Sequence, residues 1–460
     1  MSVPPTRADP FARRMSEVVG GPVGEHARPH RWWVPVRVLL ALFAVVFALS
    51  LVQHQPCVNT NWSSDQARYG KMCYSDVPYL YTGRGYAEGL WPYSDSDGRS
   101  EVTEYPVGIS YVAWLGAKLT QLDPSGPPLA ERHYGGADRL WSLPGMATEV
   151  NTYFFVTALL MCLFGLVATW FLAGTHRGRP WDGLYFVLSP ALLLTGLINW
   201  DLMAVAFVAG ALWAWSRDKP LLTGVMIGLG AATKLYPLFL LGPVLIVAWR
   251  RRRLGAFGWA TLGAALAWVV TNLPAWLTGF EQWKVFWSFN STRGADLGSL
   301  WLVLQDAGHT VTPQTINVWS WVIFGAVCLA VGVLGLMAPE TPRLAQLGFL
   351  VIAGFLLVNK VYSPQYVLWL LPLAAMARPR WRDLLIWQAG EALYFAAVWA
   401  FLGGVLASGT GQTPVYDWAI LLRVAAELYL VVIVVRDVLR PQHDPLRQAE
   451  PARAPAVALS

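Results

Sequence analysis

The chain has 460 residues, of which 55% are hydrophobic and only 13% are charged, and its formal net charge is +6. A soluble globular chain usually carries about 25% charged residues, so the composition excludes an ordinary soluble domain. Most of the basic residues lie in short connections between apolar blocks. The positive charge therefore indicates orientation in a membrane and not nucleic-acid binding.

The apolar residues form blocks of about 16–22 residues, the length with which a helix crosses about 30 Å of hydrocarbon. This pattern predicts an all-α polytopic membrane protein with about twelve spans. We expect the spans at roughly 37–53, 150–173, 181–199, 202–216, 221–235, 236–249, 256–277, 316–337, 344–359, 364–377, 384–407 and 417–435. Residues 37–435 would then form a single transmembrane domain between tails at 1–36 and 436–460.

Basic residues gather in alternate connections, such as 250–253 and 378–382, and in both tails. Because positively charged connections remain in the cytoplasm, we expect both termini to be cytoplasmic. The first span is interpreted as a retained anchor, although Ala48-Leu49-Ser50 loosely resembles a signal-peptide cleavage site. Two large loops, at 54–149 and 278–315, are then extracytoplasmic.

Segment 108–122 offers two interpretations. Its modest length and Lys118 favour a helix that lies in the membrane interface. As a thirteenth span it would invert the orientation of everything that follows, and residues 250–253 would lie outside. We interpret it as interfacial.

Three ionisable residues lie near the outer ends of separate spans. Lys234 follows only about 13 residues after Pro220, a rise of roughly 20 Å, which is too short to cross the hydrocarbon. Lys360 follows about 16 apolar residues, and Asp201 lies at the outer end of its helix pair. Ionisable residues at such depth are candidates for function, with snorkelling anchors or structural ion pairs as the alternative.

The first outer loop contains two cysteines and two candidate carboxylates. Cys57 and Cys73 predict a disulfide, with two free thiols as the alternative. Asp76 and Glu104 can hold a carboxylate at the membrane surface. Such a group can accept a proton from a hydroxyl while nearby cations stabilise a departing phosphate. The alternative role of Asp76 is to cap a helix that begins at Val77.

Other polar residues are interpreted as structural. Arg423 and Glu427 are four residues apart and are expected to pair on one helix. Asp95 and Asp97 lie among Ser94, Ser96 and Gly98, which is typical of a solvated turn and not of a metal site. The sequence predicts no metal centre, and whether a metal is required stays open.

Several segments, in this order, resemble glycosyltransferase family 87 of the GT-C superfamily: "SDVPYLYTGRGYAEGLWPY" followed by "EYP", "NWDLMAVAFVAGALWAW", "ATKLYPLFLLGPVLI" and "NKVYSPQYVLWLLPL". The resemblance covers most of residues 37–435 and implies a GT-C-like bundle with interfacial helices in its first outer loop. It further implies an inverting transferase of the bacterial plasma membrane. The donor would be a polyprenyl-phosphate sugar, with mannose as the implied sugar, and the acceptor a glycolipid or glycan of the cell envelope.

The resemblance places the catalytic carboxylate at Asp76, because that superfamily carries one in its first extracytoplasmic loop. Three cations are expected to bind the donor phosphate as point charges: Lys234, Lys360 and Arg293. Four further residues are expected to contact the substrates: Glu104, Asp201, Tyr362 and Gln365. No cofactor is expected beyond the donor, and the lipid bilayer is the surrounding partner. The alternative is a transporter or flippase of lipid-linked sugars, but the sequence shows no internal repeat of the kind such folds often have.

The orientation can be tested with reporter fusions. Because the basic connections should stay inside, fusions after Arg253 and Arg382 are expected to report a cytoplasmic location. Fusions near Asp97 and Gly294 are expected to report an external one. An external signal after Arg253 would show that segment 108–122 spans the membrane.

Overall fold

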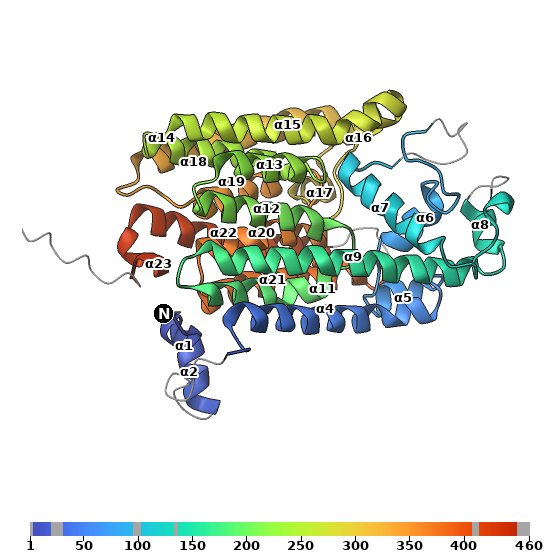
Figure 1. Cartoon of the computed structure of the whole chain (residues 1–460), viewed down its shortest axis with the longest axis horizontal. Helices are drawn as coiled ribbons and strands as arrows, with labels where there is room; N and C mark the ends of the chain where they lie inside the picture. Colours follow the sequence, from blue (N-terminus) through green and yellow to red (C-terminus); the bar gives the residue numbers. More distant parts are fainter. Residues whose placement is uncertain (1–2, 20–30, 95–102, 133–136, 407–413, 449–460) are drawn as a thin grey trace, which may run out of the picture.

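The computed structural model describes residues 3–19, 31–94, 103–132, 137–406 and 414–448, and every regular element in these ranges is a helix (Figure 1). Among the described residues, six helices are long and apolar enough to cross a membrane. They are α4 (Pro35–Asn59), α9 (Met146–Thr175), α15 (Leu254–Thr278), α18 (Pro313–Met337), α21 (Trp381–Leu402) and α22 (Pro414–Leu439). This confirms an all-helical polytopic membrane protein.

Shorter apolar helices lie among these six. They are α12 (Asp201–Ser216), α13 (Pro220–Ala231), η3 with α14 (Tyr236–Leu240 and Leu241–Arg250), α19 (Leu344–Val358), and η4 with α20 (Pro364–Tyr366 and Val367–Ala377). The expected span at 181–199 is instead broken into η2 (Pro180–Gly183), α10 (Leu184–Val187) and α11 (Pro190–Thr195). Pro190 lacks the backbone N–H that a continuous helix would need, so α10 cannot run on through it. Proline is tolerated in the first turn of a helix, and a new helix, α11, begins there.

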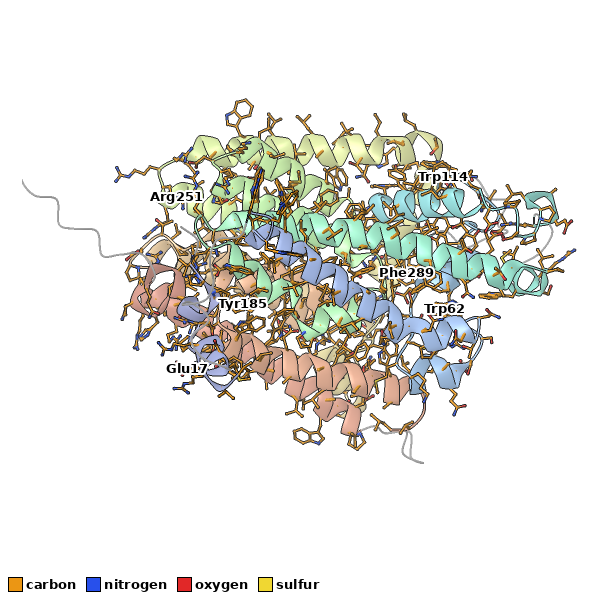
Figure 2. All side chains as sticks on the ribbon, turned by 60° about the horizontal axis from the view of Figure 1, so that its bottom comes forward. Glu17, Trp62, Trp114, Tyr185, Arg251 and Phe289 are labelled. Atoms are coloured by element: carbon orange, nitrogen blue, oxygen red, sulfur yellow. A yellow bond between two sulfur atoms is a disulfide. The ribbon has the colours of Figure 1, made fainter. Side chains whose placement is uncertain are left out.

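The long helices lie side by side along the longest axis of the molecule (Figure 1). The helices of the segment 54–149 gather at one end: α5 (Asp65–Gly70), α6 (Val77–Gly83), α7 (Val107–Thr120), η1 (Leu129–Glu131) and α8 (Ala137–Ser142). The N-terminal α1 (Pro5–Ala8) and α2 (Pro10–Val19) and the C-terminal α23 (Pro445–Gln448) lie at the opposite end. Figure 2 shows the same separation, with Trp62 and Trp114 at one end and Arg251 and Glu17 at the other.

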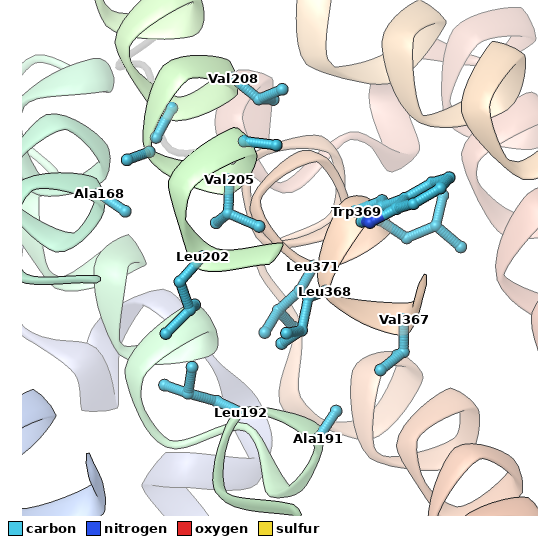
Figure 3. Packing of buried hydrophobic residues seen from close by; sticks show 14 of the residues in the cluster. Ala168, Ala191, Leu192, Leu202, Val205, Val208, Val367, Leu368, Trp369 and Leu371 are labelled. Atoms are coloured by element: carbon cyan, nitrogen blue, oxygen red, sulfur yellow. The ribbon is translucent and has the colours of Figure 1, made fainter. Parts of the chain in front are cut away.

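Apolar side chains fill much of the bundle interior and also cover much of its exterior. In Figure 3, Leu202 and Val205 of α12 face Leu368 and Leu371 of α20, and all four side chains are buried. A helix that is apolar on every side belongs in the interior, as α12, α19 and α20 do. By contrast, only 17% of the most apolar 18-residue stretch of α15 is buried inside the protein, and the same fraction holds for α18. These two helices therefore present apolar side chains to lipid.

Small residues bring α13 and α15 into close contact. A Cβ atom added at Gly224 would lie 1.8 Å from the backbone oxygen of Ala260, and one at Gly228 would lie 2.3 Å from that of Ala264. Glycine and alanine at such an interface let two helix backbones approach closely. The end of α13, which leads to Lys234, is consequently held against α15.

We expect Gly224→Ala to lower the melting temperature of the purified protein. The added methyl group meets backbone atoms, which cannot rotate away, and overpacking of this kind costs about 1–3 kcal/mol. Gly258→Ala on α15 is the matched control, because a Cβ there meets nothing within 4 Å. Equal melting temperatures for the two variants would show that the contact does not constrain the bundle.

Candidate functional site

A cavity of about 800 Å³ lies where the bundle meets the helices of segment 54–149. Its wall is formed by residues that precede α6 and α7, by α16 (Phe280–Thr292), and by parts of α18, α19, α20 and α21. Phe289 of α16, labelled in Figure 2, lies on this wall. The cavity is therefore built where segments distant in the sequence meet.

Six of the eight residues predicted to act in catalysis or substrate binding line this cavity: Asp76, Glu104, Lys234, Arg293, Lys360 and Gln365. The other two lie behind its surface. Asp201 contacts Lys234 from the protein interior. The Tyr362 hydroxyl donates a hydrogen bond of 2.7 Å to Glu427 in the interior, so the ring does not face the cavity.

Asp76 is held between the outer loop and the bundle. Its backbone N–H donates to the carbonyl of Ile198 at 2.8 Å, and its Oδ2 accepts a hydrogen bond of 2.7 Å from Asn199. The Tyr74 hydroxyl donates a second hydrogen bond to the carboxylate. Although Asp76 immediately precedes α6, its side chain makes no capping hydrogen bond, so the capping alternative is wrong.

Burial raises the pKa of the Asp76 carboxyl above its usual value. The hydrogen bonds from Asn199 and Tyr74 and the charge of Lys234 oppose this shift, because each stabilises the ionised form. In turn, the negative charge of Asp76 raises the pKa of Tyr74, which stays a neutral donor. A carboxylate with a raised pKa binds a proton more strongly and is a better general base.

Glu104 lies on the same wall but is already engaged. Its two carboxylate oxygens accept hydrogen bonds of 2.8 and 3.1 Å from Arg84. This two-point pair with a guanidinium engages both carboxylate oxygens of Glu104, so they are less free to contact a substrate hydroxyl. Of the two carboxylates, Asp76 is the better placed base.

Lys234 combines a structural contact with a position on the cavity wall. Its Nζ lies 3.5 Å from Oδ1 of Asp201, and Trp369 donates a hydrogen bond of 2.7 Å to the same oxygen. The ammonium also lies over the ring of Tyr105, 4.6 Å from its centre. Both charges are almost completely buried, and a buried charge persists only when it is paired. Lys234 is therefore both a partner in a structural ion pair and a residue of the cavity wall.

Lys360 and Arg293 form a second cationic region. The Lys360 Nζ donates to Oδ1 of Asn317 at 2.6 Å and to the backbone oxygen of Asn290, and both acceptors are neutral. Arg293 donates to Asp296 at 3.0 Å. Burial and the neighbouring charge of Arg293 lower the pKa of Lys360, which shows that the two cations lie near each other. An anion between them would relieve this repulsion.

Three residues of the cavity wall each have a buried polar atom that lacks a hydrogen-bond partner within the described parts of the chain. These atoms are Oε1 of Gln365, the hydroxyl of Tyr236 and the indole Nε1 of Trp399, and all three residues are buried. Buried polar atoms in proteins are almost always hydrogen-bonded. The residues around the cavity thus leave one acceptor, one hydroxyl and one donor unsatisfied.

Sequence reasoning missed four residues that shape the site: Tyr74, Tyr105, Asn199 and Trp369. Asn199 and Tyr105 lie inside the segments "NWD" and "EYP", which carry the resemblance to the family, so their position in these segments could have identified them as site residues. Nothing in the apolar stretch around Trp369 indicates its hydrogen bond to Asp201.

The expected pairing of Arg423 with Glu427 is wrong. Arg423 instead donates a hydrogen bond of 2.8 Å to Glu391, on the neighbouring helix α21. Glu427 accepts the hydrogen bond from Tyr362, and the guanidinium of Arg423 lies 3.3 Å from the centre of the Tyr362 ring. These groups fix the loop after α19 from behind the cavity.

No cluster of three or more histidine, cysteine, aspartate or glutamate residues suited to a metal ion occurs in the described ranges. Asp95 and Asp97 lie outside those ranges. Cys57 and Cys73 form a disulfide, with their Cα atoms 5.7 Å apart. This bond joins the outer end of α4 to the chain three residues before Asp76.

Comparison with protein families shows that residues 140–364 match the model of glycosyltransferase family 87. No curated protein matches the chain. The match confirms the resemblance to this family over these residues. It includes Lys234, Arg293 and Lys360, while Asp76 and Glu104 precede it.

We expect Lys360→Met to weaken the binding of dodecyl phosphate by about tenfold or more, since a charge-assisted hydrogen bond contributes roughly 1.5–3 kcal/mol. The variant breaks no ion pair but removes the hydrogen bonds from Lys360 to Asn317 and Asn290, so its melting temperature without ligand is expected to be lower and serves as the baseline for the shift. Binding is measured as the ligand-induced shift in melting temperature. Lys284→Met, on an exposed lysine of α16, is the control. An unchanged dodecyl phosphate affinity in Lys360→Met would identify Lys360 as an anchor.

Proposed function

We propose, from the match of residues 140–364 to the model of glycosyltransferase family 87, that the chain transfers a sugar from a polyprenyl-phosphate donor to a hydroxyl of a cell-envelope glycolipid or glycan. Mannose is the first sugar to test, because the sequence resemblance implies it. One observation carries the proposal. A carboxylate with a raised pKa and three cations face the same cavity.

The proposed step is a single in-line displacement. The acceptor oxygen attacks the anomeric carbon while its proton passes to the Asp76 carboxylate. The new carbon–oxygen bond forms as the bond from the anomeric carbon to the phosphate oxygen breaks, and the electron pair leaves with the phosphate. Lys234, Arg293 and Lys360 stabilise the negative charge that develops there, and the sugar inverts its configuration.

The apolar part of the cavity supports a lipid-linked donor. Phe324 and Phe355 line it, together with Trp287 and Trp321. Trp287 is 40% exposed and Trp321 is 55% exposed, so the apolar wall continues onto the outer surface of the bundle. An apolar wall next to cations suits a phosphate that carries a hydrocarbon tail.

The disulfide supports an extracytoplasmic site. Such bonds persist in oxidising compartments and are rare in the cytosol. Cys73 lies three residues before Asp76, so the loop that carries this carboxylate would face the outside of a bacterial plasma membrane. The chain termini, at the opposite end of the bundle, would then be cytoplasmic (Figure 1).

We expect Asp76→Asn to reduce turnover by at least two orders of magnitude. The substitution keeps the size of the side chain but removes its basicity, and general-base catalysis contributes about 10²–10⁴ in rate. Donor affinity should barely change, because the cations remain. Turnover is measured as the release of polyprenyl phosphate from purified protein supplied with polyprenyl-phosphate mannose and an acceptor.

Glu104→Gln is the control for the loss of a carboxylate on the same wall, and we expect a smaller reduction because Glu104 is bound to Arg84. The pH profile adds a second readout. Asp76 acts only when ionised, and its pKa is raised, so kcat/KM should fall on the acid side at a higher pH than the usual aspartate value of about 3.9. Near-parental turnover in Asp76→Asn would remove its proposed role. If neither variant loses activity and the protein flips lipid-linked sugars in liposomes, the results would favour a transporter.

A further inference from the structure

Asn199 connects the Asp76 carboxylate to the hydroxyl of Tyr105, and its hydrogen bonds fix the direction of its amide. Its Oδ1 accepts a hydrogen bond of 2.6 Å from the backbone N–H of Trp200, and a backbone N–H can only donate. Its Nδ2 lies 2.7 Å from Oδ2 of Asp76 and 2.7 Å from the hydroxyl oxygen of Tyr105. Because this nitrogen carries two hydrogens, it donates one to each oxygen.

The Tyr105 hydroxyl therefore accepts from Asn199, and its own hydrogen points elsewhere. Within the described parts of the chain, no protein atom accepts a hydrogen bond from this hydroxyl. Burial and the negative charges of Asp76 and Glu104 raise the pKa of Tyr105, so the hydroxyl keeps its hydrogen at neutral pH. Since Tyr105 lines the cavity, one neutral hydrogen-bond donor is available to a ligand there.

The ring of Tyr105 also supports a cation. The Lys234 Nζ lies 4.6 Å from the centre of this ring, and both residues line the cavity. An ammonium over the face of a tyrosine is attracted by the negative charge of the ring face. One side chain thus reaches the proposed proton acceptor, through Asn199, and a cation expected to bind the donor phosphate.

The proposed displacement decides which substrate oxygen gains from the hydrogen of Tyr105. The attacking oxygen shares a lone pair with the anomeric carbon, so a hydrogen bond donated to it would make it a weaker nucleophile. The departing oxygen takes up an electron pair and gains negative charge. A donor at the departing oxygen therefore binds the transition state more strongly than the bound substrate, which lowers the barrier.

We propose that Tyr105 is a further catalytic residue, whose hydroxyl donates a hydrogen bond to the donor phosphate at the oxygen that leaves the anomeric carbon. The inference rests on the proposed function and adds a neutral donor to its three cations. The hydrogen stays on Tyr105, because a phenol is a far weaker acid than a phosphate. The bond from the anomeric carbon to the phosphate oxygen breaks, its electron pair stays on that oxygen, and the hydrogen bond strengthens as the charge develops.

The test is the affinity of the full-length protein for dodecyl phosphate, which carries the same free phosphate as the lipid released by the reaction. Tyr105→Phe keeps the ring beside Lys234 and removes only the hydroxyl. We expect the variant to bind dodecyl phosphate about tenfold more weakly, because a hydrogen bond to a charged group is lost. Its kcat/KM for polyprenyl-phosphate mannose should fall by at least that factor. Affinity is measured from the ligand-induced shift in melting temperature, with each variant's own melting temperature as baseline.

Further variants separate this role from an effect that passes through Asn199. Asn199→Ala removes the contacts with Asp76 and Tyr105, so turnover should fall while the affinity for dodecyl phosphate stays near that of the parent. Adding Tyr105→Phe to Asn199→Ala should still weaken dodecyl phosphate binding by the same factor. Asp76→Asn, in which Asn199 remains, provides a second background for this comparison.

Tyr111→Phe is the matched control for the loss of a tyrosine hydroxyl. Tyr111 lies in α7, five residues after Val107 is approached by the same chain segment as Tyr105, and it donates to the backbone oxygen of Thr271 at 3.1 Å. It does not line the cavity, so Tyr111→Phe should leave the affinity for dodecyl phosphate unchanged.

The outcomes distinguish this inference from the proposed function. A parental affinity for dodecyl phosphate in Tyr105→Phe, together with a lower kcat, would limit Tyr105 to holding Asn199 against Asp76 and would overturn the inference. A loss of affinity that disappears in the Asn199→Ala and Asp76→Asn backgrounds, or an increase only in the KM for the acceptor, would also overturn it. In each case the parent still transfers sugar. A parent that releases no polyprenyl phosphate from the donor, even with complete envelope glycolipid extracts, contradicts the proposed function itself.

Discussion

The buried ion pair between Lys234 and Asp201 is the interaction on which the cavity depends. Asp201 begins α12, the helix at the centre of the bundle, and Trp369 of α20 donates to the oxygen that faces Lys234. Lys234 in turn follows α13, which close glycine contacts fix against α15. Removing one partner of such a pair typically costs about 3–5 kcal/mol, because the other charge is left buried and unpaired. One electrostatic contact therefore joins three helices and sets a cation at the edge of the cavity.

The cavity separates three kinds of chemistry in space. Cations held by α16 and α18 lie beside apolar side chains, Asp76 lies at the junction with the outer loop, and aromatic rings extend from Asp76 toward α21. Asp76 has Lys234 on one side and Tyr74 on the other. The Asp76 carboxylate thus lies between the cations and the aromatic rings. In the proposed transfer it would be the proton acceptor, next to the carbon atom at which one bond forms and another breaks.

Depth in the membrane made part of this arrangement predictable. Short apolar segments before Lys234 and Lys360 placed both ammonium groups below the outer surface, and the structure brings both to the cavity wall. The same reasoning gave Asp201 its position but not its role, since a sequence does not show that a carboxylate lies behind a lysine. Tyr362 was selected from its place near Lys360, but its side chain turns into the protein interior, where its hydroxyl donates to Glu427 and its ring faces Arg423. Asn199 escaped prediction because a hydrogen bond across 123 residues, as between Asn199 and Asp76, depends on how the loop folds back onto the bundle.

The bond between Cys57 and Cys73 couples the position of Asp76 to the membrane. Cys57 lies in the last turns of α4, and only 22% of the most apolar stretch of that helix is buried, so α4 faces lipid as α15 and α18 do. Helices that face the bilayer tilt and shift as its thickness changes. Asp76 lies three residues after Cys73, so a shift of α4 is transmitted to the segment that carries this carboxylate, while the backbone hydrogen bond to Ile198 holds the same segment to the bundle. The thickness of the surrounding bilayer is therefore a variable that acts on the position of the Asp76 carboxylate.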